Sequence, residues 1–239
     1  MKIVFLIEKN GNHCNRLFQS LHFHAFCLNE NSIFINLSLL GIIRFDNKVF
    51  NILDKLNNIL LKFISKIIFI NKDKKVKIEF PNFSLEFVRG SNFRVNSLTQ
   101  KYHEKLKLAY DFKSNDCLIH AAKIKKYVSK LNSQKKFVIG LHIRKGDYNI
   151  WNNGDYYFDD NTYNKIIKSL RKQFLIKKIE VFIVVVSNEK VSSDLDFDYF
   201  AQGTWREDLI TLQNCELLVG PPSTFTMWAS YISQIPLIH

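Results

Sequence analysis

The chain has 239 residues, enough to bury a substantial hydrophobic core in one domain or in two small ones. Hydrophobic residues make up 46% and charged residues 23%, with few glycines and prolines, which excludes wholesale disorder. The formal net charge of +12 suits a nucleic acid, an anionic membrane surface or a phosphate-bearing substrate as partner, or simply a solvated basic surface.

No segment of the sequence is typical of export or of membrane spanning. The apolar start, residues 1–7, is too short for a signal core and lacks a small-residue cleavage site. No window reaches the roughly 18 uninterrupted apolar residues of a spanning helix. The four cysteines form no CxxC pair, which suits a reducing compartment. We therefore expect a cytoplasmic protein, with the inner face of a membrane as a second location that the basic charge allows.

The first half of the chain begins like a doubly wound α/β sheet. A buried strand is expected at residues 2–7, then a polar turn, a helix from about Asn15, and a strand at residues 32–37. The strongly apolar segment 56–70 carries lysines one helical turn apart, which fits either a core-facing helix or a helix on a membrane surface. Two short strands and one helix are also expected, at residues 76–80, 85–88 and 116–131.

The pattern of the second half indicates a β-α-β series of its own. Residues 137–143 and 180–186 are near-continuous apolar runs, typical of parallel strands that are buried on both faces. A polar loop and a helix from Thr162 to about Phe174 lie between them. The remaining helices are expected at 205–214 and 223–233, and the remaining strands at 199–201, 215–219 and 236–238. We therefore predict an α/β fold of two Rossmann-like domains, residues 1–132 and 133–239.

A histidine, an arginine and an aspartate stand at the end of the first strand of the second domain, in the segment His142–Asp147. Ligands of open α/β sheets bind beyond the carboxyl ends of the strands. The guanidinium of Arg144 can donate two parallel, charge-assisted hydrogen bonds to a phosphate. His142 shares its face of the strand, and Asp147 could orient Arg144 or contact a substrate. The sequence therefore predicts a phosphate site around Arg144, and a strand end with surface charges is the alternative.

Three segments together resemble the superfamily of α-1,2-, α-1,6- and protein O-fucosyltransferases. The segment His142–Asp147 is similar to its His-x-Arg-Arg/Lys-x-Asp motif. Residues 11–19 are similar to its amino-terminal Gly-rich loop, and residues 220–231 to its carboxyl-terminal Ser-Thr-Phe-x-x-Trp-x-x-Tyr segment. The overall likeness is nearest to the bacterial α-1,2-fucosyltransferases, although Lys145 stands where those enzymes usually carry a second arginine.

The resemblance implies two facing Rossmann-like domains of the B-type glycosyltransferase fold. It also implies an inverting, metal-independent transfer that needs no cofactor, with GDP-fucose as the expected donor. Arg144 would contact the β-phosphate as a catalytic residue, and Asp147 is the first-ranked general base ahead of Asp155, Asp159 and Glu8. The expected donor-binding residues are His142, Arg144, Asn15, Ser187, Ser223, Thr224 and Phe225.

The start of the last helix is a phosphate site on physical grounds as well. Ser223 and Thr224 are expected to open a helix directly after a strand, and helix amino termini bind phosphate. An ordinary Ser/Thr helix cap is the plainer interpretation of the same residues.

The loop after Arg144 offers candidate contacts for the acceptor. Trp151 and Tyr156 present flat apolar faces that suit sugars, and Asp155 could accept a hydroxyl proton. A loop that merely faces solvent is the alternative. A glycan acceptor, free or lipid-linked, would suit the basic charge, because lipid-linked acceptors lie beside anionic lipid.

Two patterns suggest metal at first sight, and neither is expected to bind it. Asp194, Asp196 and Asp198 contain an Asp-x-Asp sequence but are more simply the polar side of the residues before a strand. His22 and His24 are about 200° apart on the predicted helix, so they cannot converge on one ion.

Three other functions remain open at this point. A glycosyltransferase of the same fold could use another nucleotide sugar, and a relative that binds sugar or nucleotide could lack catalysis. A nucleic-acid-binding protein would show a contiguous basic stripe and a steep salt dependence, and we do not expect one.

Overall fold

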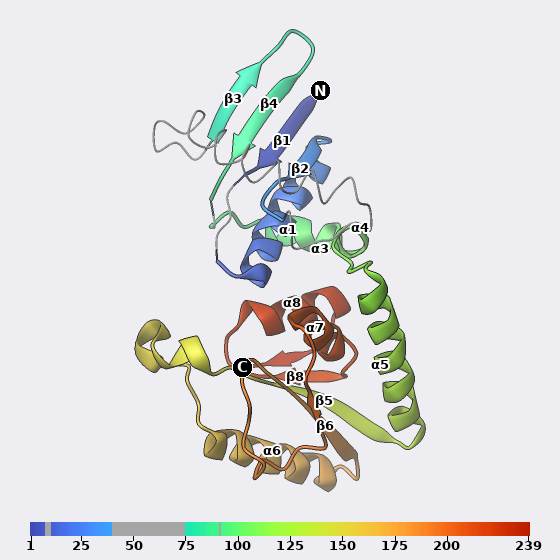
Figure 1. Ribbon diagram of the computed structural model, residues 1–239. Coiled ribbons are helices and arrows are strands. Elements are labelled where there is room, and N and C mark those ends of the chain that lie inside the picture. The colour runs from blue at the N-terminus through green and yellow to red at the C-terminus, as the bar shows by residue number, and fades with distance from the viewer. Residues whose placement is uncertain (8–10, 40–74, 91) are drawn as a thin grey trace. The chain divides into compact units, whose positions relative to one another are not determined.

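The structure is a computed structural model that describes residues 1–7, 11–39, 75–90 and 92–239 (Figure 1). The chain forms two compact units, Met1–Ser114 and Asn115–His239. The first helix of the second unit, α5 (Asn115–Ser133), was assigned to the first domain by the sequence analysis. It belongs to the second unit, which it contacts for example through His120, whose Nε2 lies 3.0 Å from Oγ1 of Thr211 in the helix at residues 205–213. The apolar segment 56–70 and Glu8 lie outside the described residues.

The first unit is built on a four-stranded sheet with the order β2-β1-β4-β3. β1 pairs in parallel with β2 and β4, and β3 is antiparallel to β4. Its elements are β1 (Lys2–Leu6), α1 (His13–Asn29), β2 (Ile33–Asn36), β3 (Lys75–Glu79), β4 (Ser84–Val88), α3 (Asn96–Lys101) and α4 (His103–Ala109). The four strands and α1 agree with the sequence analysis, whereas α3 and α4 were not predicted, because each spans less than two full turns.

The second unit carries a five-stranded sheet in which every pair is parallel, with the order β7-β6-β5-β8-β9. The strands are β5 (Lys136–Ile143), β6 (Glu180–Ser187), β7 (Tyr199–Ala201), β8 (Leu217–Val219) and β9 (Leu237–Ile238). After α5, the helices are η1 (Gly146–Asn149), η2 (Trp151–Gly154), α6 (Asp160–Ile176), α7 (Trp205–Gln213) and α8 (Thr224–Ser233). Counted from the first strand of the unit this is the order 3-2-1-4-5, which is the Rossmann arrangement.

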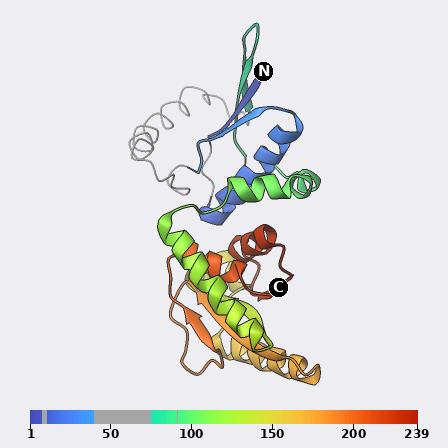
Figure 2. The ribbon, with the colours of Figure 1, turned by 90° about the vertical axis from the view of Figure 1, so that its right-hand side faces the viewer.

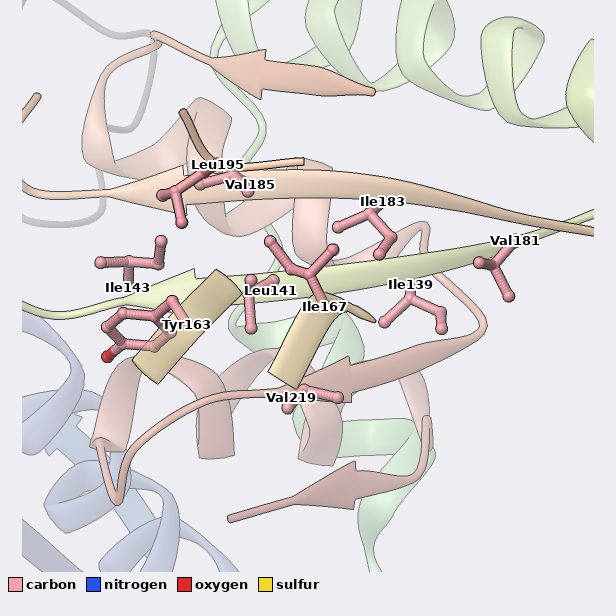
Figure 3. Packing of buried hydrophobic residues seen from close by; sticks show 10 residues of the cluster. All are labelled: Ile139, Leu141, Ile143, Tyr163, Ile167, Val181, Ile183, Val185, Leu195 and Val219. Carbon is pink, nitrogen blue, oxygen red and sulfur yellow. The ribbon is translucent and has the colours of Figure 1, made fainter. Parts of the chain in front are cut away.

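Helices cover both faces of this sheet. Ile139 and Ile183 point to one face, where α6 packs Tyr163 and Ile167 against them in a hydrophobic cluster (Figure 3). Side chains of a strand alternate between faces, so Phe182 points to the other side and meets Tyr127 of α5 with ring centroids 5.9 Å apart. The helices α5 and α6 therefore lie on opposite faces of the sheet (Figure 2).

The strand order fixes where a ligand can bind. From β5 the chain proceeds outward through β6 to β7, and then returns to place β8 on the other side of β5. The connections after β5 and after β8 thus diverge, and open α/β sheets bind their ligands beyond the carboxyl ends of the strands at such a switch point. Within the described ranges, no helix is both long enough and apolar enough to cross a membrane.

Candidate functional site

The ends of β5 and β8 are held side by side by a close backbone approach. Leu141 of β5 pairs with Val219 of β8, and each strand then turns into its loop. A Cβ atom on Gly220 would lie 2.9 Å from the carbonyl oxygen of His142. Only glycine therefore lets the loop after β8 pass directly over the end of β5.

That loop leads straight into α8. Ser223 is its N-cap, in an extended conformation, and its hydroxyl accepts a hydrogen bond from the Phe225 amide at 3.2 Å. Thr224 and Phe225 form the first turn of the helix, so their backbone N–H groups belong to its positive end. The predicted helix start is therefore present, and it lies beside the end of β5.

Arg144 is the first residue after β5, and its guanidinium is only partly engaged. Its Nη2 lies 2.9 and 2.8 Å from the two carboxylate oxygens of Asp147. The guanidinium carbon lies 5.4 Å from the centre of the Tyr148 ring. The Nε–H group is buried, and no residue in the described ranges accepts a hydrogen bond from it. A buried donor of a charged group without an acceptor needs an explanation, and a bound anionic ligand is one.

Tyr148 connects Arg144 to the start of α8. Its hydroxyl donates a hydrogen bond to the carbonyl oxygen of Pro222 at 2.7 Å, one residue before the N-cap Ser223. The ring that lies under Arg144 is thus fixed to the loop that starts α8. The structure therefore brings Arg144 and Ser223 to the same edge of the sheet, and Tyr148 is a linking residue that the sequence analysis missed.

His142 lies behind this edge. It is 2% exposed, its Nδ1 lies 2.7 Å from Thr226 Oγ1, and its ring is 5.2 Å from the ring of Phe225. Burial, and next the charge of Arg144, lower the pKa of His142 to about 3. The imidazole is therefore neutral and fixes the first turn of α8 to β5.

The loops after β5 and β6 are joined by polar contacts. The backbone N–H of Lys145 donates to Asn188 Oδ1 at 2.9 Å. The ammonium of Lys145 lies 2.6 Å from Asp160 Oδ1, and the Lys145 side chain is 13% exposed. Ser187, at the end of β6, accepts a hydrogen bond from the backbone of Glu189 at 3.3 Å. The charge of Lys145 is therefore engaged within the protein.

A row of aromatic rings extends outward from Arg144 along η1 and η2. The ring of Trp151 lies 5.0 Å from Tyr148 and 5.3 Å from Tyr156, and Trp151 is 49% exposed. Asp155 accepts a hydrogen bond from the side-chain amide of Asn152 at 2.9 Å. The three predicted acceptor residues thus form one cluster, which continues from the ring beneath the guanidinium.

Other predicted residues are placed elsewhere. Asn15 lies on α1, in the first unit. The carboxylate of Asp198 accepts hydrogen bonds from the Ile183 amide at 2.7 Å and from Arg171 at 2.9 Å, and Asp196 Oδ2 lies 3.0 Å from Arg171 Nε. These two carboxylates hold the loop before β7. In the part of the chain that the structure describes, no group of His, Cys, Asp and Glu is arranged to hold a metal ion.

A further carboxylate of the same sheet edge was missed by the sequence analysis. Asp208 sits in the first turns of α7, which begins just after β7, and it is 8% exposed. It accepts a hydrogen bond from the backbone N–H of Gly203 at 3.1 Å, and burial raises its pKa to about 6. In the sequence it follows Thr204 and Glu207, which form a capping box, so it resembles an ordinary acidic helix start.

A parallel sheet in Rossmann order, with an arginine and a helix start at its switch point, defines the class of doubly wound α/β proteins, in which such switch points suit phosphate groups. The fold is similar to that of POFUT1 in complex with GDP, with a TM-score of 0.54 and 11% identity over 98% of this chain and 96% of that chain. For POFUT1 in complex with GDP-fucose the TM-score is 0.45, with 10% identity over 99% and 96%. No protein with a curated description matches the sequence.

The pattern of the family described as "Glycosyl transferase family 11" matches residues 1–236. The chain therefore belongs to glycosyl transferase family 11 and is a glycosyltransferase. This agrees with the enzyme class that the motif segments predicted, and the predicted α/β fold of a two-domain glycosyltransferase is confirmed by the likeness to POFUT1.

Proposed function

We propose that this enzyme transfers fucose from GDP-fucose to a hydroxyl of a glycan, with inversion at the anomeric carbon and without a metal ion. The family match supports the transfer of a sugar. The likeness to POFUT1, which is in complex with GDP, supports GDP as the nucleotide. The observation that carries the proposal is the buried Nε–H of Arg144 beside the start of α8, for which the described residues offer no acceptor.

In the proposed reaction the acceptor oxygen forms a bond to the anomeric carbon while the bond from that carbon to the β-phosphate oxygen breaks. GDP leaves with the electron pair, and the acceptor's proton passes to a base or to water. Negative charge grows on the β-phosphate in the transition state, so fixed donors at that place lower the barrier. Arg144 and the amides of α8 would supply them, and Ser223 and Thr224 would add their hydroxyls. In metal-dependent transferases a divalent ion stabilises the charge of the leaving diphosphate, and in this proposal the positive charge of these groups does so instead.

Asp147 is proposed as the residue that holds Arg144 in place. Both of its oxygens lie within 2.9 Å of the guanidinium, so the carboxylate is already engaged by a cation. A carboxylate whose two oxygens are both directed at Arg144 is poorly placed to take a proton from an acceptor hydroxyl. Asp155, which among the described residues accepts a hydrogen bond only from Asn152, is then the better candidate for the proton.

His142 is proposed as a positioning residue for the donor site. Its burial and its hydrogen bond to Thr226 orient the first turn of α8, whose amides would face the phosphates. Phe225, which lies against the His142 ring, completes this support. Direct contacts of Asn15 and Ser187 with the donor remain predictions from the family resemblance.

The acceptor is proposed to lie against the aromatic row. The half-exposed face of Trp151 offers stacking area to a sugar ring, and Tyr156 extends it. A glycan acceptor, free or linked to a lipid, fits such a surface. The row begins at the ring beneath Arg144, so a sugar stacked on it would lie close to the donor's phosphate.

The test is to measure binding and transfer with a panel of donors. Isothermal titration with GDP, UDP and ADP is expected to show binding of GDP alone, and incubation with GDP-fucose and candidate glycans should yield a fucosylated product. NMR of the product gives the anomeric configuration, and activity should persist in EDTA. Binding of another nucleotide in place of GDP would show that the donor is not GDP-fucose. Binding of the donor without transfer or hydrolysis of its sugar would identify a non-catalytic relative.

A further inference from the structure

The edge of the second sheet opposite Arg144 carries an unusual surface. Lys136 opens β5 and Glu180 opens β6, and they are directly paired, so the turns before the two strands lie next to each other. Both turns hold a lysine in the left-handed conformation, Lys135 with φ 61° and Lys178 with φ 58°. Packing of Phe174, at the end of α6, on Phe137 at 5.0 Å fixes the helix end to this place.

We call this surface the basic edge. It consists of exposed lysines of the last turn of α5, of the last two turns and the C-cap of α6, and of the two turns before the strands, together with two exposed aliphatic residues. Its members are Lys130, Lys135, Lys172, Lys177, Lys178, Leu175 and Ile176.

Among the residues that the structure describes, no carboxylate neutralises the positive charge of the basic edge. The acidic residue of the two turns, Glu180, forms its ion pair with Lys136 at 2.8 Å. Within the described ranges, none of the five lysines of the basic edge forms an ion pair. Lysines near a helix carboxyl end are favourable for the helix dipole, but one or two suffice for that. The remaining charge is available to an anionic partner.

The aliphatic pair at the centre of this charge indicates the kind of partner. Leu175 is 72% exposed and Ile176 is 74% exposed, side by side at the end of α6. Single-stranded nucleic acid is bound through aromatic rings and arginines, and the basic edge has neither. Anionic bilayers attract clustered lysines to their headgroups and take up aliphatic side chains below them.

We propose that the basic edge binds the surface of an anionic membrane, with Leu175 and Ile176 inserted among the lipids. This inference does not depend on which sugar nucleotide the enzyme uses. The eight residues of β5 extend from the basic edge to the edge of the sheet that carries Arg144, a span of about 25 Å. Arg144 and the start of α8 would therefore face away from the lipid, and the acceptor would be a glycan that extends well beyond the headgroups.

Vesicle sedimentation tests the proposal with the full chain. We expect binding to vesicles that contain phosphatidylglycerol, little binding to pure phosphatidylcholine, and release by salt, because exposed charges are screened. The double variant Lys135→Glu, Lys177→Glu should lower partitioning at least about tenfold. The double variant Leu175→Ser, Ile176→Ser should lower partitioning as well, and salt should release it at a lower concentration than the unchanged protein, because the inserted side chains are lost.

Two matched controls separate this edge from general charge and hydrophobicity. Lys165→Glu with Lys168→Glu makes the same charge change on exposed residues of the first half of α6. Leu118→Ser with Ile119→Ser removes another exposed aliphatic pair, on α5. Both controls should bind vesicles within about twofold of the unchanged protein. The proposal would be overturned if a control lost as much vesicle binding as its test variant. It would also be overturned if the unchanged protein bound neutral vesicles as well as anionic ones, or bound no vesicles at all.

The test also separates this proposal from the proposed function. Fucose transfer to a soluble glycan should be unchanged in the Leu175 and Ile176 variant, because the residues lie at the opposite edge of the sheet. Concentration-dependent dimers that disappear in the same variant, without vesicle binding, would show that a second copy of the chain covers the surface and would refute a membrane partner.

Discussion

Replacement of Arg144 by alanine examines the donor site most directly. The change removes the guanidinium whose Nη2 contacts Asp147 at 2.9 Å and whose Nε–H has no acceptor in the described part of the chain. If that group stabilises the leaving phosphate, its loss costs about 3 kcal/mol of transition-state stabilisation, or roughly a hundredfold or more in kcat. Arg144→Lys keeps a charge but cannot make two parallel bonds, so we expect it to recover only part of the loss.

The same change should have little effect on folding. The Arg144 side chain is 22% exposed and that of Asp147 is 51% exposed, so their ion pair contributes less than about 1 kcal/mol to stability. Thermal unfolding of Arg144→Ala should therefore lie close to that of the unchanged protein, which separates a chemical defect from misfolding.

The assay is the initial rate of fucose transfer over a range of GDP-fucose concentrations, with GDP binding measured by titration. Lys168→Ala, which removes an exposed cation of α6, is the control for general charge. Asp147→Asn should lower kcat less than Arg144→Ala does, and the double variant should be no worse than Arg144→Ala alone, because the carboxylate acts through the arginine. Turnover of Arg144→Ala within threefold of normal would refute the role of the guanidinium.

Three further predictions concern the support of the site. Because the pKa of His142 is lowered to about 3, the unfolded chain takes up a proton that the folded chain refuses as the pH falls below about 6.5. The free energy of unfolding is therefore higher above that pH and falls on acidification. In His142→Gln this fall should be smaller between about pH 6 and 4. Curves of unfolding free energy against pH that run parallel for the variant and the unchanged protein would contradict this. Because burial raises the pKa of Asp208 to about 6, the folded chain favours its protonated form, so stability is greatest below the ordinary pKa near 4 and is lost as the pH rises through 6. Asp208→Asn, which can still accept from Gly203, should raise the melting temperature at pH 8 and not at pH 4, and a gain at both would point to another cause. Gly220→Ala places a methyl group 2.9 Å from a backbone oxygen, so it should cost about 1–3 kcal/mol in chemical denaturation and lower transfer, and an unchanged midpoint would contradict the close approach.

The sequence by itself determined most of the helices and strands of the second unit and the kinds of side chain that stand at its strand ends. Parallel strands buried on both faces need unbroken apolar runs, so residues 137–143 and 180–186 were recognisable as β5 and β6. Helix starts are encoded by the residues at the cap, as at Ser223 before α8. The position of Arg144 at a strand end follows from the same local pattern.

Only the tertiary structure decided which strand ends meet. Nothing local states that β8 lies next to β5, and that neighbourhood is what brings Ser223 to Arg144. The same packing sets how far a group is removed from water, so the neutral state of His142 could not be read from its place in a motif. Side-chain type and local periodicity are properties of short segments, whereas strand order and desolvation arise from contacts between residues far apart in the chain.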